Sequence, residues 1–266
     1  MRTRYVKDRS QVRQLQDIYA TPAFLESRAV STSFLTDPEV VAELLPPPLA
    51  PAAEPRVYVS VYTIGRSNCV GPFDGASVNI ACTYQGEPGM YCLTMPMSTD
   101  VAIIFGRELY AEPKKLATVD LDVRGAHITG RVTRYGTAYI ELGVHLGGDP
   151  VEVDRSSTSH HYYFKYMPAA DGHGLAFDPQ LVRVTHTGRT HRLAQGTATL
   201  VFRESPHDPV IDIPVLEVEG GAYSEGETHT RAEVVATVPA EQFLPYAYGK
   251  IDDLTQWAGM AQPVTA

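Results

Sequence analysis

From residue 56 onward the chain consists of short segments that alternate apolar with polar residues, and this pattern constrains the fold more than any other feature. RVYVSVYTI (56–64), ASVNIACTY (76–84) and TAYIELGVHL (137–146) are examples, and VAIIF (101–105) is a shorter, wholly apolar one. Val, Ile, Thr and Tyr are enriched in them, and Gly, Pro or Asp turns separate them. About ten strands at this spacing predict a mainly β (α+β) fold, in which an antiparallel sheet or closed barrel is flanked by a few helices.

Helices are predicted at two places before these strands and at one place after them. Apolar residues recur at helical spacing over 8–19. In TDPEVVAELLPPPLA (36–50), Thr36 or Asp37 is a suitable N-cap, Pro38 suits the first turn, and the proline run ends the helix. PAEQFLPYAYGKIDDLTQWAGM (239–260) is predicted to form a last helix with a tail. No linker or repeat interrupts the chain, so we expect one domain over 1–266, with an N-terminal helix in 1–20 and a C-terminal tail over 252–266.

Composition excludes several classes of partner. The 266 residues are 44% hydrophobic and 20% charged, which is typical of a globular protein that buries a core. The formal net charge of -9 argues against binding to nucleic acid or to an anionic membrane. No apolar stretch approaches the ~20 residues that span a bilayer, and the polar start favours a cytoplasmic protein. Three cysteines without a CxxC pair predict free thiols rather than disulfides.

The segment GRELYAEPKKLA (106–117) contains two adjacent lysines, although only five of the 22 basic residues are lysines. A solvated surface is the ordinary place for lysine. Here, however, apolar residues flank the pair on both sides. A neutral amine can attack a carbonyl, and both an apolar pocket and a neighbouring positive charge favour the neutral form. The resulting protonated imine accepts electrons when a neighbouring bond breaks, so Lys114 and Lys115 are candidate catalytic residues.

The same segment resembles the signature of the acetoacetate decarboxylase superfamily, in which Gly-Arg-Glu is followed at fixed spacing by Pro-Lys-Lys. TPAFLESRAV, LLPPPL, YYFKYMPAADG and VRVTHTGRTHRLAQGTATLVF resemble further parts of the family. The likeness covers most of residues 20–250. It implies an antiparallel β-barrel of the acetoacetate decarboxylase type with an internal site, a small keto acid as substrate, no cofactor, and assembly into a homo-oligomer.

The resemblance also implies roles for individual residues. Lys114 matches the Schiff-base lysine and Lys115 matches the cationic neighbour that keeps it neutral, the activation described for acetoacetate decarboxylase. Arg28 matches the arginine that binds the substrate carboxylate, a role that suits a bidentate guanidinium. Glu108 matches a residue that is mainly structural near the site.

The chain departs from the decarboxylases of this family at two positions. They place two further glutamates in the pocket, whereas this chain has Ser60 and Gly75 there, with Asp74 beside the second. Because the residues around the imine choose the bond that breaks, aldol condensation, dehydration or cyclisation of pyruvate-like 2-keto acids is an alternative to decarboxylation. A non-catalytic barrel that binds a small organic acid through Arg28 and Lys114 is a second alternative.

Several tyrosines and histidines are further candidates for a functional site. Tyr62, Tyr110 and Tyr246 are candidates for substrate binding, because a phenol can position water or protonate an intermediate. Packing is the commoner role for any single tyrosine. The histidines, among them His160, His161, His186 and His191, form no recognisable metal motif and are better explained as surface or hydrogen-bonding residues. No GxSxG or GxGxxG run is present, so neither a serine elbow nor a nucleotide cofactor is supported.

Overall fold

The computed structural model describes residues 3–258, whose strands belong to one 12-stranded sheet. The strands are β1 (Ala23–Leu35), β2 (Ala50–Pro51), β3 (Arg56–Ser67), β4 (Phe73–Tyr84), β5 (Glu87–Met97), β6 (Lys114–Leu116), β7 (Thr118–Arg124), β8 (His127–Arg134), β9 (Thr137–Leu146), β10 (Val151–Lys165), β11 (Gln180–Phe202) and β12 (Glu217–Thr237). Ten of them lie in the order β10-β5-β4-β3-β1-β12-β11-β9-β8-β7, while β2 pairs with β4 and β6 pairs with β5. Mainly-β architecture with flanking helices is therefore confirmed.

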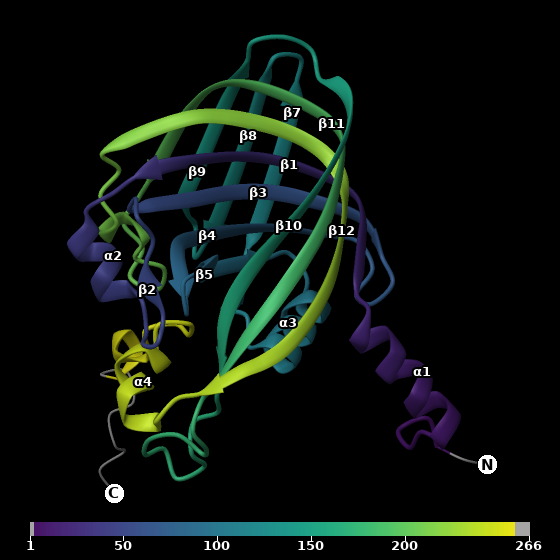
Figure 1. Cartoon of the computed structure of the whole chain (residues 1–266), viewed down its shortest axis with the longest axis vertical. Coiled ribbons are helices and arrows are strands. Elements are labelled where there is room, and N and C mark those ends of the chain that lie inside the picture. The colour runs from purple at the N-terminus through teal and green to yellow at the C-terminus, as the bar shows by residue number, and fades with distance from the viewer. Residues whose placement is uncertain (1–2, 259–266) are drawn as a thin grey trace, which may run out of the picture.

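The sheet closes on itself, because β10 pairs with β11 as well as with β5. The closed part contains β10, β5, β4, β3, β1, β12 and β11, and it curves around the centre of the molecule in Figure 1. The sheet is mixed rather than purely antiparallel, which corrects the sequence-based expectation. β5 pairs in parallel with both β10 and β6. A helix connects β5 to β6, and such a crossover is what joins parallel neighbours.

Side chains on the two faces of the closed strands enter different apolar clusters. The larger core lies where β7, β8 and β9 cover β1, β3 and β4; there Gly130 of β8 lies against Val30 and Val61. The smaller cluster lies on the inner face and includes Met97 and Tyr163. Because successive strand residues point to opposite faces, one strand supplies both clusters.

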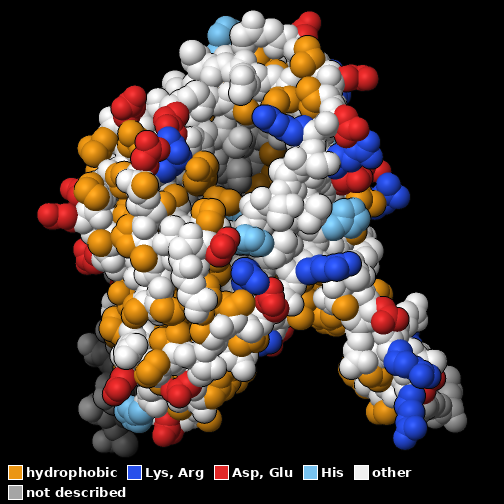
Figure 2. Space-filling view, in the orientation of Figure 1, with side chains coloured by type: hydrophobic (Ala, Val, Ile, Leu, Met, Phe, Trp, Pro, Cys, Tyr) orange, Lys and Arg blue, Asp and Glu red, His pale blue; other side chains and the backbone are white. Residues whose placement is uncertain are grey.

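Four α-helices surround the sheet within the described residues: α1 (Arg9–Ala20), α2 (Pro38–Leu44), α3 (Asp100–Tyr110) and α4 (Ala240–Ala247). The first two confirm the sequence-based predictions. Asp8 caps α1 in a capping box, and Asp37 caps α2 ahead of Pro38. α1 stands away from the body in both the ribbon and the space-filling view (Figures 1 and 2), and none of its residues is buried.

The segment VAIIF was predicted as a strand, and this prediction was wrong. It lies in α3, where Ala102 and Phe105 are buried while Val101 and Ile104 are exposed. A short apolar run fits a strand or a helix equally well, and the three-to-four-residue spacing of the buried positions distinguishes them only once the flanks are included.

The C-terminal helix was also predicted too long. α4 ends at Ala247, and the chain from there to residue 258 forms a short 3₁₀ turn (Leu254–Trp257). Part of the predicted tail, 259–266, lies outside the described residues. Within residues 3–258 the three cysteines are free, and no helix is long and apolar enough to cross a membrane.

Candidate active site

The turn between α3 and β6 places Lys114. α3 ends where Ala111 adopts a left-handed conformation (φ 63°), and its N–H donates to the carbonyl of Arg107. The chain then folds back over the end of the helix, so that the N–H of Glu112 donates to the carbonyl of Gly106. The Arg107 guanidinium donates to the carbonyl of Lys114 over 2.9 Å. These contacts fix the backbone of the lysine-bearing strand against the helix.

Lys114 forms a buried ion pair with Glu112. The Lys114 Nζ lies 2.7 Å from Glu112 Oε2, and the two side chains are only 7% and 8% exposed. Lys114 Nζ also donates to the carbonyl of Ala102 over 3.2 Å. Glu112 lies within the signature segment, but the resemblance implies no role for it. Residues two apart in an extended chain point to the same side, so the spacing from Glu112 to Lys114 could have indicated their contact.

The missing side chain of Gly106 makes room for this pair. A Cβ atom there would lie 2.0 Å from Glu112 Oε2 and 2.5 Å from Lys114 Nζ, closer than unbonded atoms approach. The glycine of the signature is therefore required for the close approach of α3 to the lysine.

Gly106→Ala is expected to lower turnover about 100-fold or more, because displacing reacting groups by about 1 Å has that effect. Overpacking should also lower the free energy of unfolding by about 1–3 kcal/mol. Steady-state kinetics and urea unfolding measure the two effects. Gly148→Ala is the matched control, since a Cβ there meets nothing within 4 Å. A fully active Gly106→Ala enzyme would show that the spacing between α3 and the lysine is not critical.

Lys114 and Glu112 line an internal cavity of about 300 Å³. Within the described chain they are the only residues with a formal charge that line it. The apolar and aromatic lining residues are Phe24, Ala29, Tyr62, Ile64, Phe73, Met95, Met97 and Tyr163. The other lining residues are Ser27, Ser77, Asn79, Ser159, His161, His186 and Thr228. The exposed area of the lining is mostly apolar, and its polar side chains surround a single ion pair.

Lys115 lies on the opposite face of β6, and the structure does not place it beside Lys114. Its Nζ lies 3.1 Å from Asp208 Oδ1 and 3.2 Å from Asp252 Oδ1. Arg134 also pairs with both aspartates. The predicted role of Lys115 as the cationic neighbour is corrected, because adjacent strand residues face opposite sides. Two cations and two carboxylates instead form a buried ionic cluster.

This cluster perturbs one of its carboxyl groups strongly. Burial alone would raise the pKa of Asp252, but hydrogen bonds from Arg134 and Tyr135 outweigh it and hold the pKa well below its usual range. The cluster joins β6, β8, the segment before the 3₁₀ turn Val210–Asp212, and the C-terminal segment. Its geometry therefore indicates a structural role for Lys115.

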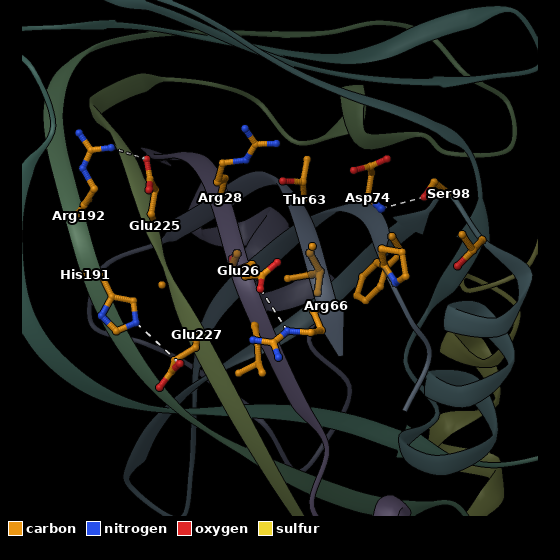
Figure 3. A pocket seen from close by; sticks show the side chains of 18 residues that line it. Glu26, Arg28, Thr63, Arg66, Asp74, Ser98, His191, Arg192, Glu225 and Glu227 are labelled. Atoms are coloured by element: carbon orange, nitrogen blue, oxygen red, sulfur yellow. Dashed lines mark hydrogen bonds and ion pairs between the residues drawn. The ribbon is translucent and has the colours of Figure 1, made fainter. Parts of the chain in front are cut away.

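Arg28 and Asp74 line a different groove, shown in Figure 3. This groove has a volume of about 840 Å³ and also contains the ion pairs Arg66–Glu26 and Arg192–Glu225. Ser27 and Ala29 line the Lys114 cavity, so Arg28 between them points to the other face of β1. Asp74 lines the groove and not the cavity, and Phe73 before it lines both, so the two pockets adjoin. The expectation that Arg28 and Asp74 share a pocket with Lys114 is corrected.

The two positions that lack glutamate do face the cavity side. Ser60 Oγ lies 3.0 Å from Ser77 Oγ, a cavity residue. A Cβ at Gly75 would lie 2.7 Å from the ring of Tyr62 and 2.9 Å from Met97 Sδ. Tyr62 thus fills the space that a longer side chain at position 75 would need. Glu112 is the carboxylate of this cavity and reaches it from the turn after α3.

The three candidate tyrosines lie in different places. Tyr62 lines the Lys114 cavity. Burial, and then the charge of Glu112, raise the pKa of its phenol well above the ordinary value, so it is protonated at neutral pH. Tyr110 packs edge-on against Phe105, and Tyr246 lines a separate aromatic cavity. Glu108 is exposed on α3, and it is Arg107 that contacts the lysine strand.

Two histidines line the cavity and do not lie on the surface. His161 on β10 and His186 on β11 both line it, with ring centroids 4.5 Å apart. His160 instead shares a hydrogen bond with Thr185, and His191 lies near Glu227 in the outer groove. Strand alternation separates His160 from His161. Which of the two faces inward follows only from how the strands close.

Burial keeps the two cavity histidines neutral. It lowers the pKa of His161 to about 3 and that of His186 to about 4, with the neighbouring imidazole and Lys114, respectively, adding to the effect. Within residues 3–258, no three or more histidine, cysteine, aspartate or glutamate side chains are arranged to hold a metal ion. The site can therefore offer an amine, a carboxylate and neutral hydrogen-bonding groups.

Comparison with known proteins gives a consistent result. Residues 10–238 match the family model described as acetoacetate decarboxylase (ADC). The acetoacetate decarboxylase of Burkholderia multivorans (strain ATCC 17616 / 249) is 32% identical over 202 residues, which are 73% of this chain and 80% of that protein.

Solved structures show the same fold. The acetoacetate decarboxylase from Legionella pneumophila has a TM-score of 0.74 at 18% identity, covering 81% of this chain and 87% of that chain. The enduracididine biosynthesis enzyme MppR, complexed with the condensation product of pyruvate and imidazole 4-carboxaldehyde, has a TM-score of 0.66 at 16% identity, covering 82% and 89%. At these identities the two structures establish the likeness of fold alone.

Proposed function

This chain belongs to the acetoacetate decarboxylase family, and from that membership we propose that it is a carbon–carbon lyase that forms a Schiff base between Lys114 and a small keto acid. The observation that carries the proposal is the buried contact of 2.7 Å between Lys114 Nζ and Glu112 Oε2 inside a mostly apolar cavity. The chemistry needs no cofactor, because the iminium itself accepts the electron pair.

The proposed reaction begins with proton transfer from Lys114 to Glu112. A low-dielectric cavity disfavours two charges, so a shared proton can move to the carboxylate and leave a neutral amine. The amine adds to the keto carbon, and the carbonyl oxygen leaves as water with a proton returned by Glu112. Such general acid–base assistance contributes about 10²- to 10⁴-fold.

Bond cleavage follows from the iminium. In a β-keto acid the bond to the carboxylate breaks, carbon dioxide leaves, and the electron pair moves to the iminium nitrogen to form an enamine. A proton adds to the enamine carbon, and water then hydrolyses the new iminium to release a ketone and regenerate Lys114. A largely apolar cavity favours this step, because a localised carboxylate charge is lost as the bond breaks.

Aldol condensation with dehydration, or cyclisation, is the second candidate. The iminium of pyruvate keeps its carboxylate and loses a methyl proton to a base such as Glu112, and the enamine so formed attacks an aldehyde instead of a proton. Two observations favour it: the glutamate positions hold Ser60 and Gly75, and the MppR structure contains a condensation product of pyruvate with an aldehyde. A non-catalytic organic-acid binder is the third candidate, and it has lost support because Arg28 lies outside the cavity.

Borohydride trapping tests the Schiff base. The protein is incubated with acetoacetate, with pyruvate, and with pyruvate plus an aromatic aldehyde, then reduced and mapped by peptide mass. We expect one adduct, on Lys114. Release of acetone from acetoacetate would identify a decarboxylase, and a conjugated product from pyruvate and aldehyde an aldolase-dehydratase. Absence of any adduct would reject the covalent mechanism for these substrates and favour the binding protein.

We also infer that copies of the chain associate and act in the cytoplasm. Val12 and Leu15 lie on one face of α1 and are 40% and 41% exposed, whereas Tyr19, further along that face, stacks on Phe105 of α3. Apolar residues on one face of a helix that no core covers are typical of an association surface.

A further inference from the structure

A keto acid brings a carboxylate into the cavity, and the structure lacks the expected arginine there. Arg28 points into the outer groove of Figure 3, where it lies near Glu225 and Asp74. Lys114 is the only cation among the described residues that line the cavity, and it already contacts Glu112. The substrate carboxylate therefore needs a partner other than a guanidinium.

We propose that His161 and His186 form the carboxylate subsite of this cavity and hold the carboxylate through neutral imidazole N–H groups. This inference rests on the proposed function, because it takes the substrate to be a keto acid bound at Lys114. It assigns the anchoring role to two residues on β10 and β11, on strands that pair directly with each other.

The two imidazoles pack against each other in the lining of the cavity. Their rings meet edge to face, at 69°, with centroids 4.5 Å apart. Within residues 3–258, the buried atoms His161 Nδ1 and His186 Nε2 have no hydrogen-bond partner. Leaving a buried polar atom without a partner costs about 1–3 kcal/mol. Because each neutral imidazole has one N–H to donate, a bound carboxylate would supply the missing partner when a ring turns its buried nitrogen toward the cavity.

The charges that face the pair keep it neutral. Lys114 and the second imidazole oppose protonation of the rings, whereas Glu112 favours protonation of His161; burial outweighs that attraction. His160, on the outer side of β10, adds a small opposing contribution. The rings thus remain donors without a formal charge down to about pH 5, the range set by the pKa values of about 3 and 4.

A neutral subsite suits bond cleavage better than a guanidinium does. Decarboxylation converts the carboxylate into uncharged carbon dioxide, so an ion pair to the carboxylate would be lost in the transition state and would raise the barrier. A hydrogen bond from a neutral donor orients the carboxylate and loses less interaction energy as the negative charge disappears. The geometry therefore favours catalysis over tight binding of the ground state.

The test compares two ketones that differ at one end: acetoacetate, with its carboxylate, and 2-butanone, with a methyl group there. Each is trapped on Lys114 with borohydride over a range of concentrations. His161→Phe and His186→Phe are expected to raise the half-saturating acetoacetate concentration roughly tenfold or more, as loss of a hydrogen bond to a charged group does. Trapping of 2-butanone should not change.

Matched variants separate binding from folding. His161→Gln and His186→Gln keep an N–H donor and should restore much of the acetoacetate affinity. His160→Phe, one residue away on the outer side, and Arg28→Gln should leave both probes unaffected. The proposal is overturned if Arg28→Gln weakens acetoacetate more than the histidine variants do, or if the histidine variants weaken both ketones equally.

The experiments test the carboxylate subsite and the Schiff base separately. If the wild-type protein forms no adduct with either ketone, the covalent mechanism fails. Calorimetric binding of acetoacetate to the wild-type protein and to the His161→Phe and His186→Phe variants then decides the subsite alone. Undiminished binding by both variants would reject it, and binding weakened tenfold would retain it.

Discussion

Lys114→Arg is expected to abolish turnover of every keto acid that the protein converts, a loss of roughly 10⁴-fold or more, because every later step of the proposed reaction depends on the Schiff base. A guanidinium is not deprotonated in this pH range and cannot form an imine. It keeps the positive charge, so the ion pair with Glu112 can persist. Steady-state turnover and mass mapping after borohydride reduction measure the two consequences, loss of product and loss of the adduct.

Lys165→Arg is the matched control for this experiment. Lys165 is partly buried and its Nζ donates to the carbonyl of Leu109, away from the Lys114 cavity. That variant should keep activity and trapping. Equal thermal unfolding of both variants and the wild type would show that the fold is intact. Turnover retained by Lys114→Arg would exclude imine chemistry at this lysine. If the wild type and both variants bind an organic acid but none of them turns it over, the binding protein is favoured.

The sequence was sufficient for most of the fold because the deciding patterns are local. The caps Asp8 and Asp37 and the alternating strands were readable directly. The closure of the sheet was not readable, because β10 pairs with β5 across about 70 residues of chain, through His161 and Tyr162 alone. β11 and β12 run without a break through Gly188 and Gly226, although such glycines resemble turns in the sequence.

The signature identified Lys114, but the residues around it depend on strand register. β1 contains an irregularity between Phe24 and Ser27, where Glu26 has a φ of 56°. One extra residue in a strand turns every later side chain to the other face. Counting along the sequence therefore could not show that Arg28 points outward. His161 and His186 meet only through the β10–β11 pairing, which is equally invisible in the sequence.

For Lys115, the alternation of side chains along a strand already argued against the role that the resemblance implied. Two adjacent residues in a strand face opposite sides, so a lysine pair on β6 cannot place both ammonium groups in one pocket. The cavity itself supplies a different cause for a neutral amine. Glu112 lies 2.7 Å from Lys114 Nζ in that cavity and is the group that we propose accepts the ammonium proton.

Lys115→Met is accordingly expected to affect stability and not chemistry. It leaves Asp208 and Asp252 sharing the single charge of Arg134 in a buried cluster. Removing one partner of a buried ionic group typically costs about 3–5 kcal/mol, and we expect a loss of about 3 kcal/mol in the free energy of unfolding because Arg134 remains. Urea unfolding measures this loss.

Two comparisons decide whether the role of Lys115 is structural. Lys115→Met/Asp208→Asn restores equal numbers of positive and negative charges and should recover part of the lost stability, a coupling that a double-mutant cycle measures. The acid limb of the pH profile of kcat/KM should stay in place in Lys115→Met. If Lys115 acted as a like-charged neighbour, its removal would favour the ammonium form of the catalytic amine and move that limb to higher pH. If the acid limb shifts and stability is unchanged, Lys115 has the electrostatic role. If stability is lost and the limb stays in place, Lys115 is structural and the cavity itself accounts for the neutral amine.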